Sequence, residues 1–169
     1  IFTTHVLQPH PCIYVENNIW KMWYVSCERW VIDKNQKKHF YNIKYRTSKD
    51  GINWDNDTKT CINYSNKYEY AIARPSVIRH NDDTYRMWYC YRASEKIDNY
   101  RIGYAVSNDG VNWDRRDNQA GINVSDFGWD CNMICYPRVF KHDDDFYMLY
   151  NGNEYGKTGF GLAKLKGNL

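Results

Sequence analysis

Hydrophobic and polar positions alternate along this chain in short runs. Stretches rich in Tyr, Trp, Val and Ile are separated by clusters of Asn, Asp and Gly. Runs of this composition predict β-strands, and the polar clusters predict the turns between them. The spacing of three and four residues that marks an amphipathic helix is absent from the sequence. The pattern therefore predicts an all-β fold.

One strand–turn–strand unit occurs three times. It begins with a proline, continues through an apolar strand and a polar turn, and ends in the pattern aromatic-x-Met-Trp-Tyr, with Leu in place of Trp in the third copy. The copies cover residues 11–24, 75–89 and 137–150. A repeated sheet of this kind cannot bury its faces alone, so neighbouring copies are expected to stack on one another.

A second unit, a strand followed by Ser-x-Asp-Gly-x-Asn-Trp, comes after the hairpin. It covers residues 43–54 and 102–113, and a shortened copy lies at 160–163. The motif resembles the Asp-box of sialidases, shortened by one residue. Because Asp-Gly forms turns and Ser and Asp side chains bond to nearby backbone, the motif is expected to be structural. This prediction applies to Asp50, Trp54, Asp109 and Trp113.

Together the two units supply about four short strands per repeat, with a period of roughly 60 residues. Such repeats without helices are typical of β-propeller blades. We predict a single partial propeller domain over residues 1–169, with blades at about 9–68, 69–129 and 130–169. Three blades do not close a ring. The chain is therefore expected either to be part of a longer protein or to form a homo-oligomer that covers the open blade edges.

Three longer blocks carry a resemblance to a known superfamily. They are EYAIARP at 69–75, GWD with MICYP within 128–137, and YNGN with YGKTGFG within 150–161. With them, the chain resembles the five-bladed β-propeller glycoside hydrolases, which include arabinanases, β-xylosidases and invertases. It is most similar to the C-terminal half of a group of longer glycosidase-like proteins. The resemblance implies carboxylates around an axial pocket, with the catalytic base on a first blade that this chain would lack.

Polar residues recur in the loops that enter the inner strands. Glu69, Asp130 and His5 lie six, seven and six residues ahead of the prolines that start those strands. In a propeller these loops open onto the central channel, and glycoside cleavage uses a pair of carboxyl groups. We therefore predict Asp130 as the general acid, Glu69 as a supporting carboxylate and His5 as a substrate-binding residue. A solvated loop acid is the alternative for Glu69.

The residues directly before the prolines are His10, Arg74 and Tyr136, and they too are expected near the channel. The cation of Arg74 could keep a nearby carboxylate ionised or bind an acidic sugar group. Arg92, at the end of the second Met-Trp-Tyr strand, completes the predicted substrate-binding set. Ordinary packing is the alternative for His10 and Tyr136, and a structural ion pair is the alternative for Arg74.

The composition argues against several other functions. The net charge is only +3 and the basic residues are dispersed, so no nucleic-acid partner is predicted. Apolar runs fall short of the ~18 residues that span a membrane, and membrane association is not predicted. The six cysteines lack metal-site spacing, which favours reduced thiols in a cytoplasmic protein with no metal site.

The sequence thus predicts a glycosidase-like protein that acts on or binds a glycoside in an axial pocket, without a cofactor. The alternative is a non-catalytic carbohydrate-binding or assembly module that lacks the first-blade base.

Overall fold

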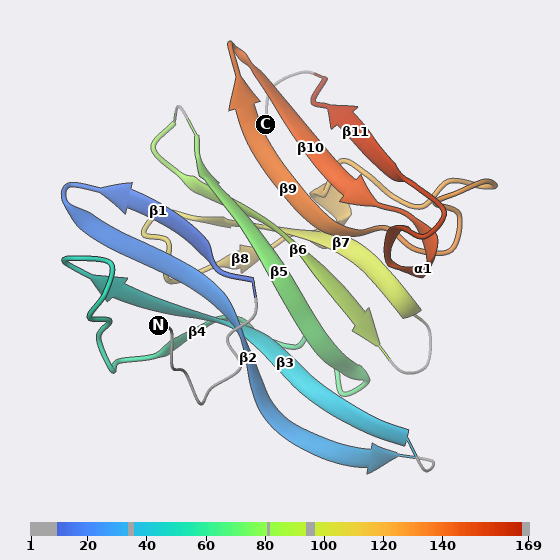
Figure 1. Cartoon of the computed structure of the whole chain (residues 1–169), viewed down its shortest axis with the longest axis horizontal. Coiled ribbons are helices and arrows are strands. Elements are labelled where there is room, and N and C mark those ends of the chain that lie inside the picture. The colour runs from blue at the N-terminus through green and yellow to red at the C-terminus, as the bar shows by residue number, and fades with distance from the viewer. Residues whose placement is uncertain (1–9, 34–35, 81, 94–96, 167–169) are drawn as a thin grey trace.

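The structure, a computed structural model, describes residues 10–33, 36–80, 82–93 and 97–166, and the chain is built from three side-by-side groups of strands (Figure 1). The first blade contains β1 (Cys12–Glu16), β2 (Ile19–Asp33), β3 (Gln36–Ser48) and β4 (Lys59–Ile62). The second contains β5 (Glu69–Arg79), β6 (Tyr85–Ala93), β7 (Ile97–Ser107) and β8 (Asp114–Arg115). The third contains β9 (Cys135–His142), β10 (Asp145–Asn151) and β11 (Phe160–Lys164). The predicted all-β propeller fold is confirmed.

Within each blade, consecutive strands pair antiparallel in chain order. The first two blades also meet through one parallel pair, Tyr41 of β3 with Ala71 of β5. A short 3₁₀ turn, Asp117–Gln119, follows β8, and a single turn, α1 (Asn153–Gly156), precedes β11. These short turns join blades without interrupting the sheets.

Two details differ from the predicted four-stranded repeat. In the first blade the fourth strand begins at Lys59 instead of at Trp54, which forms only an isolated bridge to Ser48. A backbone hydrogen bond of 2.9 Å from Asp55 to Thr47 closes this turn, so the chain joins the sheet again only further on. The third blade has three strands within the described residues.

The period of two in β6 divides its side chains between two seams. Met87 and Tyr89 point into a core shared with the first blade, while Trp88 points into a core shared with the third. All residues from Tyr85 to Cys90 are buried, because the second blade has a neighbour on each face. Burying a large apolar side chain contributes roughly 1.5–3 kcal/mol, so these seams hold the blades together.

The outer face of the third blade has a different character. Along β11 exposed and half-buried residues alternate, and the side chains of Phe160 and Leu162 are 76% and 60% exposed. Leu162 pairs across the ladder with Leu149 of β10, which is also exposed. A free apolar edge of this kind favours pairing with another sheet. That a second copy covers it stays a prediction, and a measurement of mass in solution tests it.

The Ser-x-Asp-Gly motifs form tight turns at the ends of β3 and β7. The Asp109 carboxylate accepts hydrogen bonds of 2.8 Å from the backbone amides of Val111 and Asn112 and one of 2.9 Å from the Ser107 hydroxyl. Gly110 has a φ of +77°, a left-handed conformation that glycine adopts without strain. Asp50 makes the same contacts in the first blade. Their geometry is that of the structural turn predicted from the sequence.

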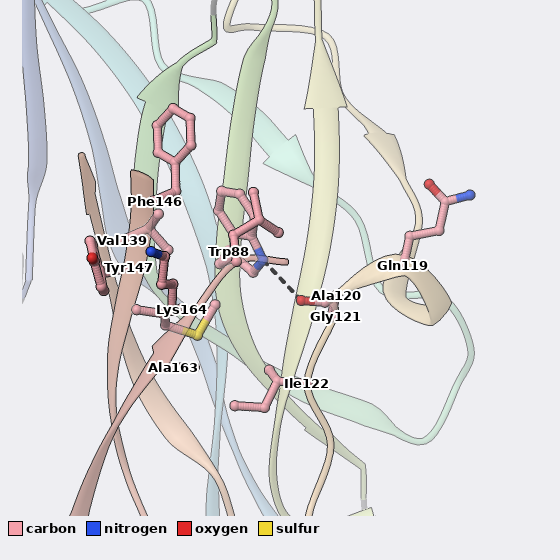
Figure 2. Close-up of a pocket in the computed structure, with 12 residues that line it drawn as sticks. Trp88, Gln119, Ala120, Gly121, Ile122, Val139, Phe146, Tyr147, Ala163 and Lys164 are labelled. Atoms are coloured by element: carbon pink, nitrogen blue, oxygen red, sulfur yellow. Dashed lines mark hydrogen bonds between the residues drawn. The ribbon is translucent and has the colours of Figure 1, made fainter. Parts of the chain in front are cut away.

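The second seam also opens into a cleft of about 90 Å³ (Figure 2). The Trp88 indole lies in this cleft and donates a hydrogen bond of 3.1 Å to the carbonyl of Ala120. Ile122 and Val139 are among the apolar side chains that line it. Since binding sites combine apolar walls with several convergent polar groups, this small hydrocarbon cleft is a poor candidate for a sugar site.

Candidate functional site

The residues before the inner-strand prolines share an unusual backbone conformation. His10, Arg74 and Tyr136 have φ values of 69°, 58° or 57°, with His10 the largest and Arg74 the smallest. None of them is glycine, so this left-handed conformation costs each residue roughly 1–2 kcal/mol. Strain of this kind, repeated at equivalent places in three blades, is typical of positions that a site imposes.

A β-bulge produces this conformation in two of the blades. In β5, Arg74 and Pro75 together lie opposite a single residue of β6, because the pairing shifts between Ala73 and Ser76. The same two-against-one shift occurs between Cys135 and Arg138 of β9. Proline fits a bulge because it has no amide hydrogen to donate to the ladder. The bulge re-aims the side chain that precedes the proline.

These re-aimed side chains meet at one pocket, which we call the cationic pocket. It has a volume of about 330 Å³ and opens at the end of the blades where β6 ends and β7 begins. Its lining residues are His10, Val25, His39, Tyr41, Ala73, Arg74, Arg92, Tyr100, Tyr136 and Tyr155. Four of the seven predicted site residues are thus together: His10, Arg74, Arg92 and Tyr136.

Two arginines give the pocket its charge. The guanidinium of Arg92 lies between the rings of Tyr70 and Tyr100, 4.9 and 4.8 Å from their centroids, and donates a hydrogen bond of 3.3 Å to the Tyr155 hydroxyl. The guanidinium of Arg74 lies over the ring of Tyr136. The Nε atoms of both arginines are buried without a hydrogen-bond partner within the described residues. Because buried donors are normally paired, these two donors are suited to a ligand.

Two histidines complete the polar lining. Burial, and then the positive charge of Arg74, lower the pKa of His10. Burial, and then the charge of Arg92, lower the pKa of His39 in the same way. Both imidazoles are therefore neutral at pH 7, and each can donate and accept a hydrogen bond. The pocket lining contains no carboxylate, so an anionic or strongly polar ligand suits it.

Glu69 lies outside this lining, in a network of its own. Its side chain is 2% exposed, and both carboxylate oxygens accept hydrogen bonds of 2.7 Å from the guanidinium of Arg115. The amide and hydroxyl of Ser65 donate to the same oxygens. Arg115 also pairs with Asp117. A carboxylate so fully occupied by protein donors is well placed to fix the start of β5, and its predicted catalytic role stays a prediction.

Asp130 is buried in the loop before β9, with 4% exposure. Its Oδ2 atom accepts a hydrogen bond of 3.2 Å from the Tyr150 hydroxyl. It does not line the cationic pocket, although the loop continues into Met133 and Tyr136, which border the pockets at this end of the blades. The structure therefore separates the two predicted carboxylates from the cationic residues. His5 lies outside the described residues.

The loop that carries Asp130 is clamped to the turn after β10 by Asn153. The Asn153 Oδ1 atom accepts hydrogen bonds from the amides of Asn132 and Met133 at 2.8 and 2.9 Å. Its amide group donates to the carbonyl of Gly128 at 3.2 Å. A Cβ added to Gly152 would lie 2.5 Å from the carbonyl oxygen of Trp129, so glycine is required there for the two segments to approach.

Sequence reasoning missed four residues of the pocket: His39, Tyr41, Tyr100 and Tyr155. The first two lie on the long β2–β3 hairpin, which resembles an ordinary alternating strand in the sequence. Tyr155 lies in α1, whose Glu154 and Tyr155 have left-handed φ values of 50° and 61°. The Gly-rich composition around α1 is the one signal that marked this loop as unusual.

Over the described ranges, no group of three or more His, Cys, Asp or Glu side chains is arranged to hold a metal ion. No helix in the same part of the chain has the length and apolar character to cross a bilayer. All six cysteines are free thiols. Cytoplasmic localisation stays a prediction.

Comparisons with known proteins match this architecture. A family model for β-1,4-mannooligosaccharide phosphorylases, glycoside hydrolase family 130, matches residues 87–166. An uncharacterised protein found in two strains of Mycobacterium tuberculosis is 38% identical over 157 residues, which are 93% of this chain and 50% of that protein. A β-1,2-mannobiose phosphorylase of Thermoanaerobacter sp. (strain X514) is 41% identical over 51 residues, 30% of this chain and 16% of that protein.

Among solved structures, a thermostable family-43 glycoside hydrolase superposes with a TM-score of 0.75 over 99% of this chain and 57% of its own, at 17% identity. These matches confirm the resemblance that the sequence blocks predicted. The chain spans about half the length of the mycobacterial relative.

Proposed function

We propose that this chain, whose blades have the fold of the five-bladed propeller glycoside hydrolases, binds a carbohydrate in the cationic pocket and takes part in chemistry at a glycosidic bond. One observation carries the proposal: His10, Arg74 and Tyr136, equivalent residues of three blades, converge on one pocket through strained backbone. A pocket of about 330 Å³ is of the size that holds a small ligand.

The charge of the pocket supports a reaction that includes an anion. Arg74 and Arg92 offer unpartnered donors, and arginine recognises phosphate and carboxylate groups. Two of the similar proteins are named for phosphorolysis of mannosides. We therefore propose a β-mannoside as substrate and inorganic phosphate as the attacking group. An oxygen of phosphate would bond to the anomeric carbon while the glycosidic C–O bond breaks.

The leaving oxygen must then receive a proton. We propose Asp130 as its donor, because it is a buried carboxyl group in the loop that leads to Tyr136. The ion pair of Glu69 with Arg115 supports a positioning role for Glu69 in place of proton transfer. Domain boundaries and residue roles in the longer relatives remain proposals for this chain.

The test is to incubate the protein at its native length with aryl β-mannosides and with β-1,4- and β-1,2-mannobiose, with and without inorganic phosphate. Phosphate-dependent release of mannose 1-phosphate that Asp130→Asn abolishes is the expected result. Asp126→Asn, an exposed acid of the same loop, is the matched control. Absence of turnover, or turnover that Asp130→Asn leaves unchanged, contradicts the catalytic proposal.

A non-catalytic carbohydrate-binding module is the second candidate. It is favoured by the lack of a carboxylate in the pocket lining and by the half-length match to the mycobacterial relative. Saturable binding of mannobiose by the wild-type protein, without turnover, would support this candidate.

A further inference from the structure

A second cleft adjoins the cationic pocket. Its lining residues are Asn99, Asn132, Met133, Asn153, Glu154, Tyr155 and Thr158, and its volume is about 500 Å³. Tyr155 belongs to the lining of both cavities. The two cavities therefore meet at one aromatic ring. We call the second cavity the amide cleft.

Tyr155 is held firmly on one side and open on the other. Its ring stacks on Tyr136 with centroids 6.1 Å apart and meets the edge of Tyr100 at 6.2 Å, while its hydroxyl accepts the hydrogen bond from Arg92. The residue is nevertheless 49% exposed. An exposed aromatic face fixed by its neighbours suits the apolar C–H face of a pyranose ring, because the ring offers apolar area beside a polar tip.

The amide cleft differs from the cationic pocket in its chemistry. Asn99 and Asn132 are exposed, and their side chains make no hydrogen bond within the described part of the chain. Each amide offers two donors and an acceptor, which matches the mixed donors and acceptors of sugar hydroxyls. The cleft has one acidic residue, Glu154, whose carboxylate is paired with Lys157 at 2.8 Å. The cleft therefore suits a neutral, hydroxyl-rich group.

The backbone that presents these groups is fixed before a ligand arrives. Asn153 joins α1 to the loop at 128–133, and Thr158 donates a hydrogen bond of 2.7 Å to the carbonyl of Trp129. Glu154 and Tyr155 keep left-handed conformations that cost energy unless the surroundings impose them. A preorganised loop loses little entropy on binding. The geometry thus has the rigidity that a binding subsite needs.

We infer that the amide cleft is a second saccharide subsite, so that the ligand is an oligosaccharide of at least two units that passes over Tyr155. This inference rests on the proposed function, because it requires one sugar unit in the cationic pocket. The unit in the cationic pocket contacts the arginines and histidines. The next unit stacks on Tyr155 and bonds to Asn99 and Asn132.

The experiment is equilibrium binding of β-1,4-mannooligosaccharides of one to four units to the protein at its native length. The quantity measured is the ratio of the Kd for mannose to the Kd for mannobiose. We expect a ratio of about tenfold or more for the wild-type protein. The double variant Asn99→Ala/Asn132→Ala should reduce the ratio to near one, and Tyr155→Phe, which keeps the ring, should preserve it. Asn118→Ala, an exposed amide outside both cavities, should leave it unchanged.

A wild-type protein that binds mannose and mannobiose equally well overturns the subsite, and so does a double variant that keeps the full ratio. Either result leaves the proposed function standing, because a sugar is still bound. Absence of binding by every saccharide overturns the proposed function and the subsite together. Since Asn99 and Asn132 are exposed, thermal unfolding of the double variant should match that of the wild type.

Discussion

The guanidinium carbon of Arg74 lies 4.2 Å from the centroid of the Tyr136 ring. The two residues occupy the same position in successive blades, each directly before a proline and each with a left-handed φ. A cation–π contact contributes roughly 0.5–2 kcal/mol, which offsets part of the strain at the two positions. The contact therefore joins the second and third blades at the rim of the cationic pocket.

Arg74 separates stability from binding. Replacing it with Ala or with Gly removes the same guanidinium, so both variants should lose at least tenfold in affinity for mannobiose. The Gly variant should be more stable than the Ala variant by about 1 kcal/mol, because glycine adopts a φ of 57° without strain. Denaturant unfolding measures the difference. Equal stabilities of the two variants would contradict the strain at this position.

The ion pair of Glu69 with Arg115 should be a major structural contact. Glu69→Gln leaves a largely buried guanidinium with Asp117 as its remaining acidic partner, so we expect a loss of about 3 kcal/mol in unfolding free energy. The double variant Glu69→Gln/Arg115→Gln should lose less than the sum of the two single changes, by at least about 1 kcal/mol. Additive losses would show that the pair is not coupled. Affinity for mannobiose in folded Glu69→Gln should stay within about threefold of wild type.

Asp109 should contribute to stability in a defined pH range. Burial alone would raise its pKa, but hydrogen bonds from Asn112 and Val111 outweigh burial and lower the pKa to about 2. A folded pKa below the ordinary 3.8 stabilises the protein above about pH 4, and the stabilisation is lost as the pH falls toward 2. Because the residue is exposed, solvent screening limits the effect to about 1 kcal/mol. Asp109→Ala should show this loss at pH 7, and its difference from wild type should shrink below pH 4, with Asn108→Ala as control.

The pocket histidines should make the protein sensitive to mild acid. The pKa values of His10 and His39 are lowered by burial and by the neighbouring arginines, so the unfolded chain binds protons more readily near pH 6. Their contribution to stability is present above about pH 6.5 and is lost as the pH falls below it. Thermal unfolding between pH 7 and pH 5 should show a smaller decline for His39→Phe than for the wild type. An equal decline would mean that His39 does not titrate in this range.

Asn153 should matter more than its place in a turn suggests. Asn153→Ala leaves the amides of Asn132 and Met133 without their acceptor, which should cost about 2–3 kcal/mol. Asn153→Asp keeps the acceptor oxygen and loses only the donor to Gly128, so its cost should be smaller. Chemical denaturation of the two variants gives the order. A larger loss for the Asp variant would contradict the clamp.

Several features could be predicted from local sequence alone. The alternation in the Met-Trp-Tyr runs predicted strands, because each strand has apolar partners in the blades on both sides. The Ser-x-Asp-Gly motif predicted a structural turn, because the hydrogen bonds of Asp50 and Asp109 all lie within six residues of chain. The X-Pro positions predicted His10, Arg74 and Tyr136, because a repeat places equivalent residues in equivalent places.

The tertiary structure alone decided which polar residues share a cavity. Glu69 was predicted to face the ligand, but Arg115, 46 residues further along the chain, occupies its carboxylate. His39 and Tyr155 reach the cationic pocket from the first and third blades, although neither lies near a proline of the repeat. A sequence fixes short-range hydrogen bonds and the period of a strand. Contacts between distant segments depend on how the stacked blades bring their ends together.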